Sequence, residues 1–319
     1  MMIPNNYEFI VVTPVYEDLE ASRQLFHELG KNFGNRVFIV AVDDGSLERP
    51  LTTDSLIGAG VNGVVLKLLR NVGHQRAIAV GLDYASTHMH PSQNIVVMDS
   101  DGEDLPQSIS VLLAELDESG NDVAVAQRKR RIESIRFKVF YNAYKRLFRI
   151  MTGRFIDFGN FMVLRHNAVR RLVTMQELSI HVAGAVLASK LRISVCPLDR
   201  GQRYAGSSKM NFVALSLHGF RALMVFAEDV LVRVGIACAI FAGLAIVGAI
   251  AAITLKLIGI STPGWFSIAL GILVLMLMQM GAIALMTLML SGVVRGVSVV
   301  APLKYRDFVD LVMEASSQK

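Results

Sequence analysis

Residues 94–104 read NIVVMDSDGED, an apolar run that ends in a cluster of carboxylates. An uninterrupted apolar run bounded by polar residues is typical of a strand that is buried on both faces. The carboxylates cannot follow this strand into the core, because burying an unpaired carboxylate costs several kcal/mol. We therefore expect Asp99 and Asp101 to lie where the strand opens into a crevice.

A hard divalent cation is one ligand that these two carboxylates suit. Asp99 and Asp101 are one residue apart, and Gly102 behind them favours a turn. Carboxylate oxygens are ligands that Mg²⁺ and Mn²⁺ prefer. An Asp-x-Asp pattern alone is nevertheless more often an ordinary polar exit from a strand, so its interpretation depends on what surrounds it.

The N-terminal two thirds of the chain alternates strand-like and helix-like segments. Apolar runs typical of strands cover residues 9–13, 37–42, 64–69, 95–98 and 123–126, and helical spacing covers 20–33 and 77–86. This order predicts an α/β fold with an open, mostly parallel sheet and helices on both faces.

Acidic residues follow three of these predicted strands, at 16–18, 43–44 and 99–101, and Arg128 follows the fifth. Ligands of such sheets bind outside the carboxyl ends of the strands. The repeated placement is therefore stronger evidence for a binding site than Asp-x-Asp alone. No Gly-x-Gly-x-x-Gly follows the first strand and no Gly-Lys-Ser/Thr loop occurs, which argues against a dinucleotide cofactor and a P-loop.

The apolar residues are concentrated in the C-terminal part of the chain. The sequence is 53% hydrophobic, and residues 234–255 and 257–294 contain no charged side chain. Since about 20 apolar residues span a bilayer, we expect transmembrane helices at about 234–256 and 266–290, joined by a turn. A buried helical hairpin in a soluble core is the less favoured alternative.

Basic residues flank the predicted hairpin on both sides, whereas only Lys256 lies between its helices. The flanking residues are Arg221 and Arg233 before it and Arg295, Lys304 and Arg306 after it. The positive-inside rule places both flanks in the cytoplasm. The N-terminus lacks the features of a signal peptide, and Cys196 and Cys238 predict no disulfide.

Four parts of the chain follow from these patterns. We expect an α/β domain at 1–206, an interfacial helix at 207–232, the transmembrane hairpin at 233–294 and a C-terminal segment at 295–319. His218 in the interfacial helix is interpreted as a packed or interfacial histidine rather than a metal ligand.

A basic stretch interleaved with aromatic residues covers 128–149 and contains nine Lys and Arg side chains. Nucleic acid is one possible partner of such a stretch. Beside two predicted membrane helices, anionic lipid headgroups and phosphorylated substrates are favoured over nucleic acid. A plain solvated basic helix face stays open for most of these side chains.

Five separated motifs followed by two membrane spans resemble family 2 glycosyltransferases of the GT-A fold. The motifs are Pro14-Val15-Tyr16-Glu17-Asp18, Asp44-Gly45-Ser46, Arg70-Asn71-Val72-Gly73, Asp99-Ser100-Asp101 with Asp104-Leu105-Pro106, and the late Arg203…Ser208-Lys209. The resemblance covers nearly the whole chain and is closest to the polyprenyl-phosphate branch, which includes dolichyl-phosphate mannose synthases and bacterial undecaprenyl-phosphate sugar transferases. It implies a Rossmann-like GT-A catalytic domain with interfacial helices and a two-helix transmembrane hairpin.

The resemblance also implies roles for individual residues. A nucleobase and ribose would contact Pro14, Tyr16, Asp18 and either Asp43 or Asp44. The donor diphosphate would bind through Mg²⁺ or Mn²⁺ on Asp99 and Asp101, with Asp101 as the direct ligand and Ser100 and Asp104 in the same segment. Donor phosphates would meet Arg128 and Arg136, and phosphate near the membrane would meet Arg203, Ser208 and Lys209.

One position departs from the pattern of the family. Gly159-Asn160-Phe161 stands where the family commonly has Gly-Asp-Phe, whose aspartate is its candidate base. Asn160 cannot take a proton, but a phosphate monoester has a second pKa of about 6 and needs no deprotonation to attack. Asn160 is therefore expected to position the acceptor, and Asp157 is the nearby residue that would serve if a base is required.

The expected activity is metal-dependent, inverting transfer of a sugar from a nucleoside-diphosphate sugar to a polyprenyl monophosphate, for glycans beyond the membrane. Asp101, Asn160, Arg128 and Lys209 are its predicted catalytic residues. The alternatives are a transferase with another lipid or saccharide acceptor and a membrane scaffold that binds the donor without turnover. The resemblance further implies a homo-oligomer, commonly a tetramer, in the bacterial inner membrane with its catalytic domain in the cytoplasm.

Overall fold

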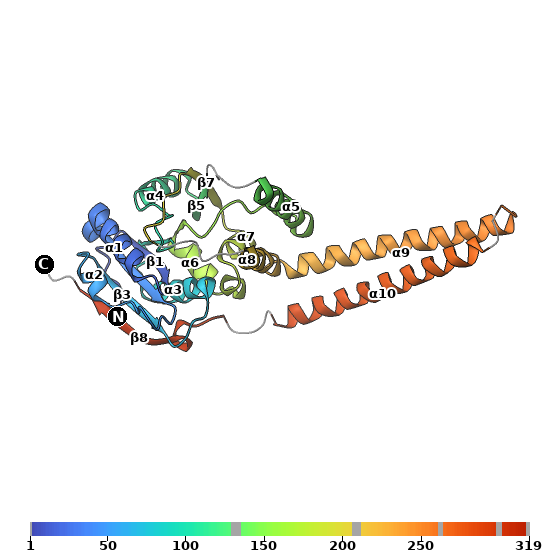
Figure 1. Cartoon of the computed structure of the whole chain (residues 1–319). Coiled ribbons are helices and arrows are strands. Elements are labelled where there is room, and N and C mark those ends of the chain that lie inside the picture. Colours follow the sequence, from blue (N-terminus) through green and yellow to red (C-terminus); the bar gives the residue numbers. More distant parts are fainter. Residues whose placement is uncertain (1, 129–134, 206–211, 261–263, 298–301, 317–319) are drawn as a thin grey trace. The chain divides into compact units, whose positions relative to one another are not determined.

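The computed structural model describes residues 2–128, 135–205, 212–260, 264–297 and 302–316. The chain divides into two compact units. The first, called the catalytic unit below, comprises Met1–Ala143, Phe155–Val225 and Ala301–Lys319, and the second comprises Tyr144–Arg154 and Phe226–Val300. Figure 1 shows the elements of both units.

The described part of the catalytic unit is built on a single eight-stranded sheet in the order β7-β5-β6-β4-β1-β2-β3-β8. β6 and β8 run antiparallel to their neighbours, and the other pairs are parallel. The strands are β1 (Phe9–Val15), β2 (Val37–Asp43), β3 (Asn62–Leu68), β4 (Asn94–Val97), β5 (Val123–Arg128), β6 (Met162–Leu164), β7 (Ile193–Leu198) and β8 (Val309–Ala315). The expected mostly parallel α/β sheet is confirmed.

Helices cover both faces of this sheet, as predicted. Alternate residues of β1 point to opposite faces, so Ile10 and Val12 pack in one core cluster with α3, and Phe9 and Val11 pack in another with α1 and α4. The helices that precede the two long apolar helices are α1 (Leu19–Phe33), α2 (Asp54–Ile57), α3 (His74–His88), α4 (Ser108–Ser119), α5 (Ile135–Thr152), α6 (His166–Leu172), α7 (Val182–Ala188) and α8 (Phe212–Met224), with short 3₁₀ turns at Gly34–Arg36, Gln176–Ser179 and Tyr305–Asp307. The residues of α5 from Tyr144 onward belong to the second unit.

The last strand, β8, comes from the C-terminal segment and closes one edge of the sheet. It pairs antiparallel with β3, and Figure 1 shows the two strands side by side. The approach to β8 is fastened to α3, because the Tyr305 backbone N–H donates to the Asp83 carboxylate at 2.8 Å and the Tyr305 ring meets Tyr84 edge-on. The segment that follows the predicted hairpin is therefore part of the catalytic unit.

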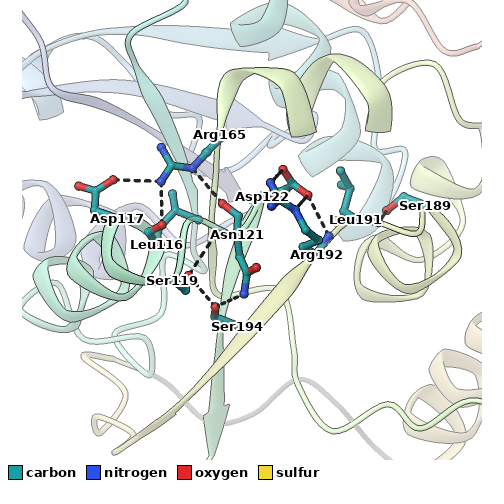
Figure 2. Close-up of polar contacts among 10 residues, drawn as sticks. All are labelled: Leu116, Asp117, Ser119, Asn121, Asp122, Arg165, Ser189, Leu191, Arg192 and Ser194. Carbon is teal, nitrogen blue, oxygen red and sulfur yellow. Dashed lines mark hydrogen bonds and ion pairs between the residues drawn. The ribbon is translucent and has the colours of Figure 1, made fainter.

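A polar network fastens the opposite side of the sheet, where β5 and β7 begin (Figure 2). The Arg165 guanidinium donates to a carbonyl in the last turn of α4 and to the Asn121 carbonyl. Arg192 makes two side-chain hydrogen bonds to Asp122, and Asn121 donates to Ser194 at 2.7 Å. The bond from Arg165 satisfies a carbonyl that the end of α4 leaves unpaired. The whole network lies at the amino ends of β5 and β7, away from the carboxyl ends where a ligand is expected.

The second unit contains two long apolar helices, α9 (Ala227–Leu257) and α10 (Trp265–Val297), which pack side by side (Figure 1). Each has an apolar stretch long enough to cross a membrane, with mean hydropathy of 2.6 and 2.4. Cys238, Ala245 and Ala252 of α9 are buried. Their seven-residue spacing is the repeat expected of a helix–helix seam.

The first long helix begins earlier than its apolar run. Residues 234–256 were expected to span the membrane, but α9 begins at Ala227 and carries Glu228 and Asp229 in its first turn. Acidic side chains are favourable at a helix N-terminus because they meet the positive end of the helix dipole. α8 covers part of the segment 207–232, and its location at a membrane interface stays a prediction.

Candidate active site

The loops that follow β2 and β3 are held by carboxylates that accept hydrogen bonds from backbone N–H groups. Asp43 is fully buried and accepts from Ser46 and Leu51, both at 3.0 Å. Asp44 accepts from the N–H groups of Val72 and Gly73, at 2.7 and 3.0 Å. Asp43 and Asp44, one of which was predicted to face the base or ribose, therefore also hold these loops, and contact of either with a nucleoside stays a prediction.

Glu17 is a residue of this region to which the sequence patterns gave no role. Its carboxylate accepts the N–H groups of three successive residues, 47–49, at 2.6, 3.1 and 2.8 Å. Its own backbone has a positive φ of 49°, a conformation that costs a non-glycine residue about 1 kcal/mol or more. Three charge-assisted hydrogen bonds offset this cost and hold the loop that follows β2.

The Asp99–Asp101 loop lies where β4 ends, as expected. The Asp99 N–H donates to Asp104, and the Ser100 hydroxyl donates to the carbonyl of Pro14 at the end of β1. Gly102 has a φ of +89°, and a Cβ at this position would lie 2.6 Å from the Tyr204 ring. The turn therefore requires glycine for both its backbone conformation and its close packing.

The predicted late arginine lies directly on this loop. The Arg203 guanidinium is 2.7 Å from the Asp101 carboxylate, and its Nε donates to Glu103 at 3.2 Å. Arg200 also pairs with Glu103, and the Tyr204 N–H donates to the Asp101 carbonyl. A segment about a hundred residues further along the chain thus brings two guanidinium groups to the Asp-x-Asp loop.

Asn160 contacts two side chains in the first turn of α3. Its Nδ2 lies 3.2 Å from Nε2 of His74, and its Oδ1 accepts from Gln75 at 3.4 Å. The same His74 nitrogen is 3.2 Å from Oδ1 of Asp99. The sequence patterns gave His74 and Gln75 no role. Their position directly after the Arg70–Gly73 motif was the only sign in the sequence that they belong to the site.

Burial and neighbouring charges shift the pKa values of three groups in the crevice. Burial raises the pKa of Asp101, and the Asp99 carboxylate raises it further. Burial also raises the pKa of Asp44. Burial lowers the pKa of His74, but the charges of Asp99, Asp101 and Asp44 and the hydrogen bond to Asp99 outweigh it, so the net shift is upward. The crevice is therefore a region of excess negative charge that would attract a cation.

The donor set fits a divalent cation that a substrate helps to bind. Among the described residues, no three His, Cys, Asp or Glu side chains gather as a metal cluster. Asp99 and Asp101 supply two hard oxygen ligands on one tight loop, and Mg²⁺ commonly binds through one or two carboxylates plus substrate phosphates. A bound Mg²⁺ or Mn²⁺ would therefore be held by these two residues and by diphosphate oxygens.

The remaining predicted site residues differ in how far the structure describes them. Tyr16, which directly follows β1, is exposed, and the Asp18 carbonyl accepts the Ser22 hydroxyl at the start of α1. Asp157 accepts from Gln127 at 3.0 Å. Arg128 ends β5 and Arg136 lies in α5, but their side chains are not described, and Ser208 and Lys209 lie outside the described residues. Their predicted phosphate contacts stay predictions.

The fold and the acidic loop place the protein in the class of GT-A-type α/β folds, and comparison with known families gives the family. The family described as Glycosyl transferase family 2 matches residues 10–178, just over half of the chain. The chain belongs to this family, and the recognition made from its motifs is confirmed.

Two curated relatives show what similar chains do. A Klebsiella pneumoniae undecaprenyl-phosphate 4-deoxy-4-formamido-L-arabinose transferase is 26% identical over 212 residues, 64% of this chain and 63% of that protein. The chain therefore matches less than two thirds of the length of this relative. The uncharacterized glycosyltransferase YkcC of Bacillus subtilis is 26% identical over 82% of this chain and 81% of its own length.

Solved structures show the same fold at low sequence identity. Glucosyl-3-phosphoglycerate synthase from Mycobacterium tuberculosis, in complex with Mn²⁺, uridine diphosphate and phosphoglyceric acid, matches with a TM-score of 0.51 and 12% identity, over 71% of this chain and 78% of that one. Its complex with Mn²⁺, UDP-glucose and phosphoglyceric acid matches with a TM-score of 0.50 and 14% identity, over 71% and 79%. This similarity confirms the GT-A fold.

Proposed function

We propose that this glycosyltransferase moves a sugar from a nucleoside-diphosphate sugar to a polyprenyl monophosphate of the undecaprenyl type. The observation that carries the proposal is one chain with both the Asp99–Asp101 loop and two helices long enough to cross a membrane. A polyprenyl chain partitions into the bilayer, so its phosphate is met at a membrane surface. The activity named for the Klebsiella relative supports this acceptor.

The reaction needs positioning and charge stabilisation more than proton transfer. An oxygen of the acceptor phosphate attacks the anomeric carbon from the face opposite the diphosphate. The bond from that carbon to the diphosphate oxygen breaks, its electron pair leaves with the diphosphate, and the anomeric configuration inverts. The acceptor, whose second pKa is about 6, is largely dianionic near pH 7 and has no proton to lose.

The residues of the crevice fit these tasks. Asp99 and Asp101 would hold a divalent cation, which when bound neutralises charge on the departing diphosphate. Arg203 lies beside Asp101, and Arg128 and Lys209 are the further cations that we propose for the diphosphate. Asn160 would orient the acceptor. These are the electrostatic and positioning contributions expected of such a site.

The membrane location belongs to the same proposal. We propose that the protein is a multi-pass protein of the bacterial inner membrane with its catalytic unit in the cytoplasm. Nucleotide sugars are made in the cytoplasm, and the basic residues that flank the hairpin favour keeping both of its ends on that side. The product would supply a sugar for envelope glycans. Assembly as a tetramer stays a prediction from the family resemblance.

A scaffold that binds a donor without turnover is the second candidate. The observation that favours it is Asn160, which stands where the family commonly has an aspartate and contacts His74 and Gln75. Such a protein would bind a nucleoside diphosphate with Mn²⁺ and transfer nothing.

A donor panel tests the proposal. Purified full-length protein with undecaprenyl phosphate and Mg²⁺ or Mn²⁺ is offered labelled UDP-, GDP- and other nucleotide sugars, and label that enters the lipid phase is counted. We expect one donor to label the lipid, and Asp101→Asn to lower the rate at least 100-fold, the scale of losing a strong electrostatic contact to the transition state. Unchanged transfer by Asp101→Asn would refute the assigned site, and metal-dependent binding without transfer by any donor would favour the scaffold.

A further inference from the structure

A pair of histidines joins α7 to α8 next to the acceptor side of the crevice. His181 precedes α7 and is buried, with 4% of its surface exposed. His218 lies on α8 and is half-buried. Their Nε2 atoms are 3.1 Å apart, and their ring centroids are 4.5 Å apart. No part of the proposed mechanism uses either side chain so far.

The hydrogen bonds fix which nitrogen of each ring carries a proton. Nδ1 of His181 accepts the backbone N–H of Gly184 at 3.0 Å. A backbone N–H can only donate, so Nδ1 of His181 has no proton and its Nε2 carries one. That proton points to Nε2 of His218, which must accept it. A neutral His218 therefore carries its proton on Nδ1, the nitrogen that faces away from His181.

Both imidazoles are held in the neutral form. Burial lowers the pKa of His181 to about 3, and a positive charge on His218 would lower it further. Burial also lowers the pKa of His218, and the charges of His74 and Arg221 lower it further. At pH 7 the pair therefore offers an N–H donor without a charge of its own.

A chain of contacts connects this pair to the Asp-x-Asp loop. The N–H of Val182, the residue after His181, donates to Oε1 of Gln75 at 2.7 Å. Gln75 then donates to Asn160, and Asn160 contacts His74, which pairs with Asp99. The helix that carries His218 is thus tied through α7 and α3 to the residues at the end of β4.

The side of His218 that faces away from His181 offers groups suited to an anion. Among the residues that the structure describes, Nδ1 of His218 makes no hydrogen bond. Arg221, which is exposed, lies three residues further along α8, and residues three apart share a helix face. A neutral N–H beside a guanidinium group suits a phosphate dianion, which accepts hydrogen bonds and is attracted to the charge.

We propose that His218 is an acceptor-binding residue, whose Nδ1–H donates to the phosphate head of a lipid monophosphate while His181 positions it in the donating tautomer. This inference rests on the proposed function and adds the residues that recognise its acceptor. The lining would consist of the neutral amide of Asn160 and the imidazole of His218, with the buried Gln75 and His181 behind them as positioning residues. Such a lining binds a dianion without the repulsion that a further carboxylate would impose.

Binding of a short lipid phosphate tests the inference without requiring transfer. The probes are farnesyl phosphate and farnesol, titrated by calorimetry into full-length protein in nanodiscs. His218→Leu removes the donor, whereas His218→Asn keeps an N–H near the position of Nδ1, and exposed His27→Leu on α1 is the matched control. We expect His218→Leu to weaken farnesyl phosphate binding roughly 10- to 100-fold and to leave farnesol binding unchanged, with His218→Asn and His27→Leu within about 3-fold of wild type.

Two further readouts separate acceptor binding from a structural role and from failure of the proposed function. UDP binding with Mn²⁺ should be unchanged in His218→Leu, because the donor side is intact. Nitrogen-15 NMR of labelled histidine should show His218 with its proton on Nδ1. Equal farnesyl phosphate affinities of His218→Leu and wild type, or a proton on Nε2 of His218, would overturn the inference even if transfer is observed. Selective loss of farnesyl phosphate binding would support it even if no sugar donor is found.

Discussion

The carboxylates at the strand ends have two kinds of role. Some hold loops in place, and others are available to bind a ligand. Asp43, Asp44 and Glu17 each accept backbone N–H groups, and these bonds fix the loops that follow β2 and β3. Asp99 faces His74, and Asp101 faces Arg203 while also accepting the backbone N–H of Glu103 at 3.0 Å. A side-chain cation can exchange its partner more readily than a backbone amide can, so the oxygens of Asp99 and Asp101 that face His74 and Arg203 are the ones we propose for a metal ion.

Asn160 decides at the residue level whether the proposed transfer needs a base. General base catalysis typically contributes about 10²- to 10⁴-fold. If a missing base limited this enzyme, Asn160→Asp would raise the turnover number by about that factor. We expect a change of less than about 5-fold, because the acceptor phosphate is already ionised.

The measurement for Asn160 is steady-state transfer to undecaprenyl phosphate by wild type, Asn160→Asp and Asn160→Ala. Asn160→Ala serves as the control that removes the contacts to His74 and Gln75 without adding a carboxylate, and it should raise KM for the acceptor. A gain of 100-fold or more in Asn160→Asp would contradict the base-free mechanism.

At the level of elements, β8 is a strand whose importance the sequence did not reveal. Its register pairs Gly63 with Ala315 and Leu66 with Val312, so it covers the β3 edge. An uncovered edge strand exposes unpaired N–H and C=O groups that can pair with other chains. We therefore expect the stability of the sheet to depend on the segment that docks β8.

Tyr305→Ala tests this dependence. The variant removes ring contacts to Tyr84 and His88, and we expect the catalytic unit to lose roughly 1–3 kcal/mol of stability. The measurement is hydrogen exchange of the β3 and β8 amides in full-length protein. Asp310→Ala, an exposed position of β8, is the control and should change stability by less than about 0.5 kcal/mol. Unaltered protection of β8 in Tyr305→Ala would show that the docking segment does not hold the strand.

The strands and helices also show why the sequence predicted some features of the fold and missed others. Runs such as 37–42 and 95–98 predicted β2 and β4, because strands buried on both faces are continuously apolar. β8 lies at an edge with mostly exposed side chains, so it lacks such a run. The His181–His218 contact joins residues 37 apart, and no local pattern encodes a pairing that only the packing of α8 against α7 creates.

At the level of the whole molecule, the connectivity of the chain constrains how it can cross a membrane. The catalytic unit precedes α9, and β8, which follows α10, returns to the sheet of that unit. A bilayer cannot separate β8 from β3, because the two strands share backbone hydrogen bonds. At 1.5 Å per residue, the 31 residues of α9 extend about 46 Å, more than the roughly 30 Å hydrocarbon core. In the proposed membrane location, the hairpin would therefore cross the bilayer twice, out and back.

Cysteine labelling tests this topology in sealed membranes. Cys196 and Cys238 are buried, so single reporters are introduced at exposed positions as Asn5→Cys, Asp310→Cys and Ile260→Cys. With a membrane-impermeant maleimide, we expect the first two to react in inside-out vesicles and the third in right-side-out spheroplasts, since basic flanks are retained in the cytoplasm. Joint labelling of Asp310→Cys and Ile260→Cys from one side, with Asn5→Cys from the other, would require β8 to leave the sheet and would refute the two-crossing arrangement.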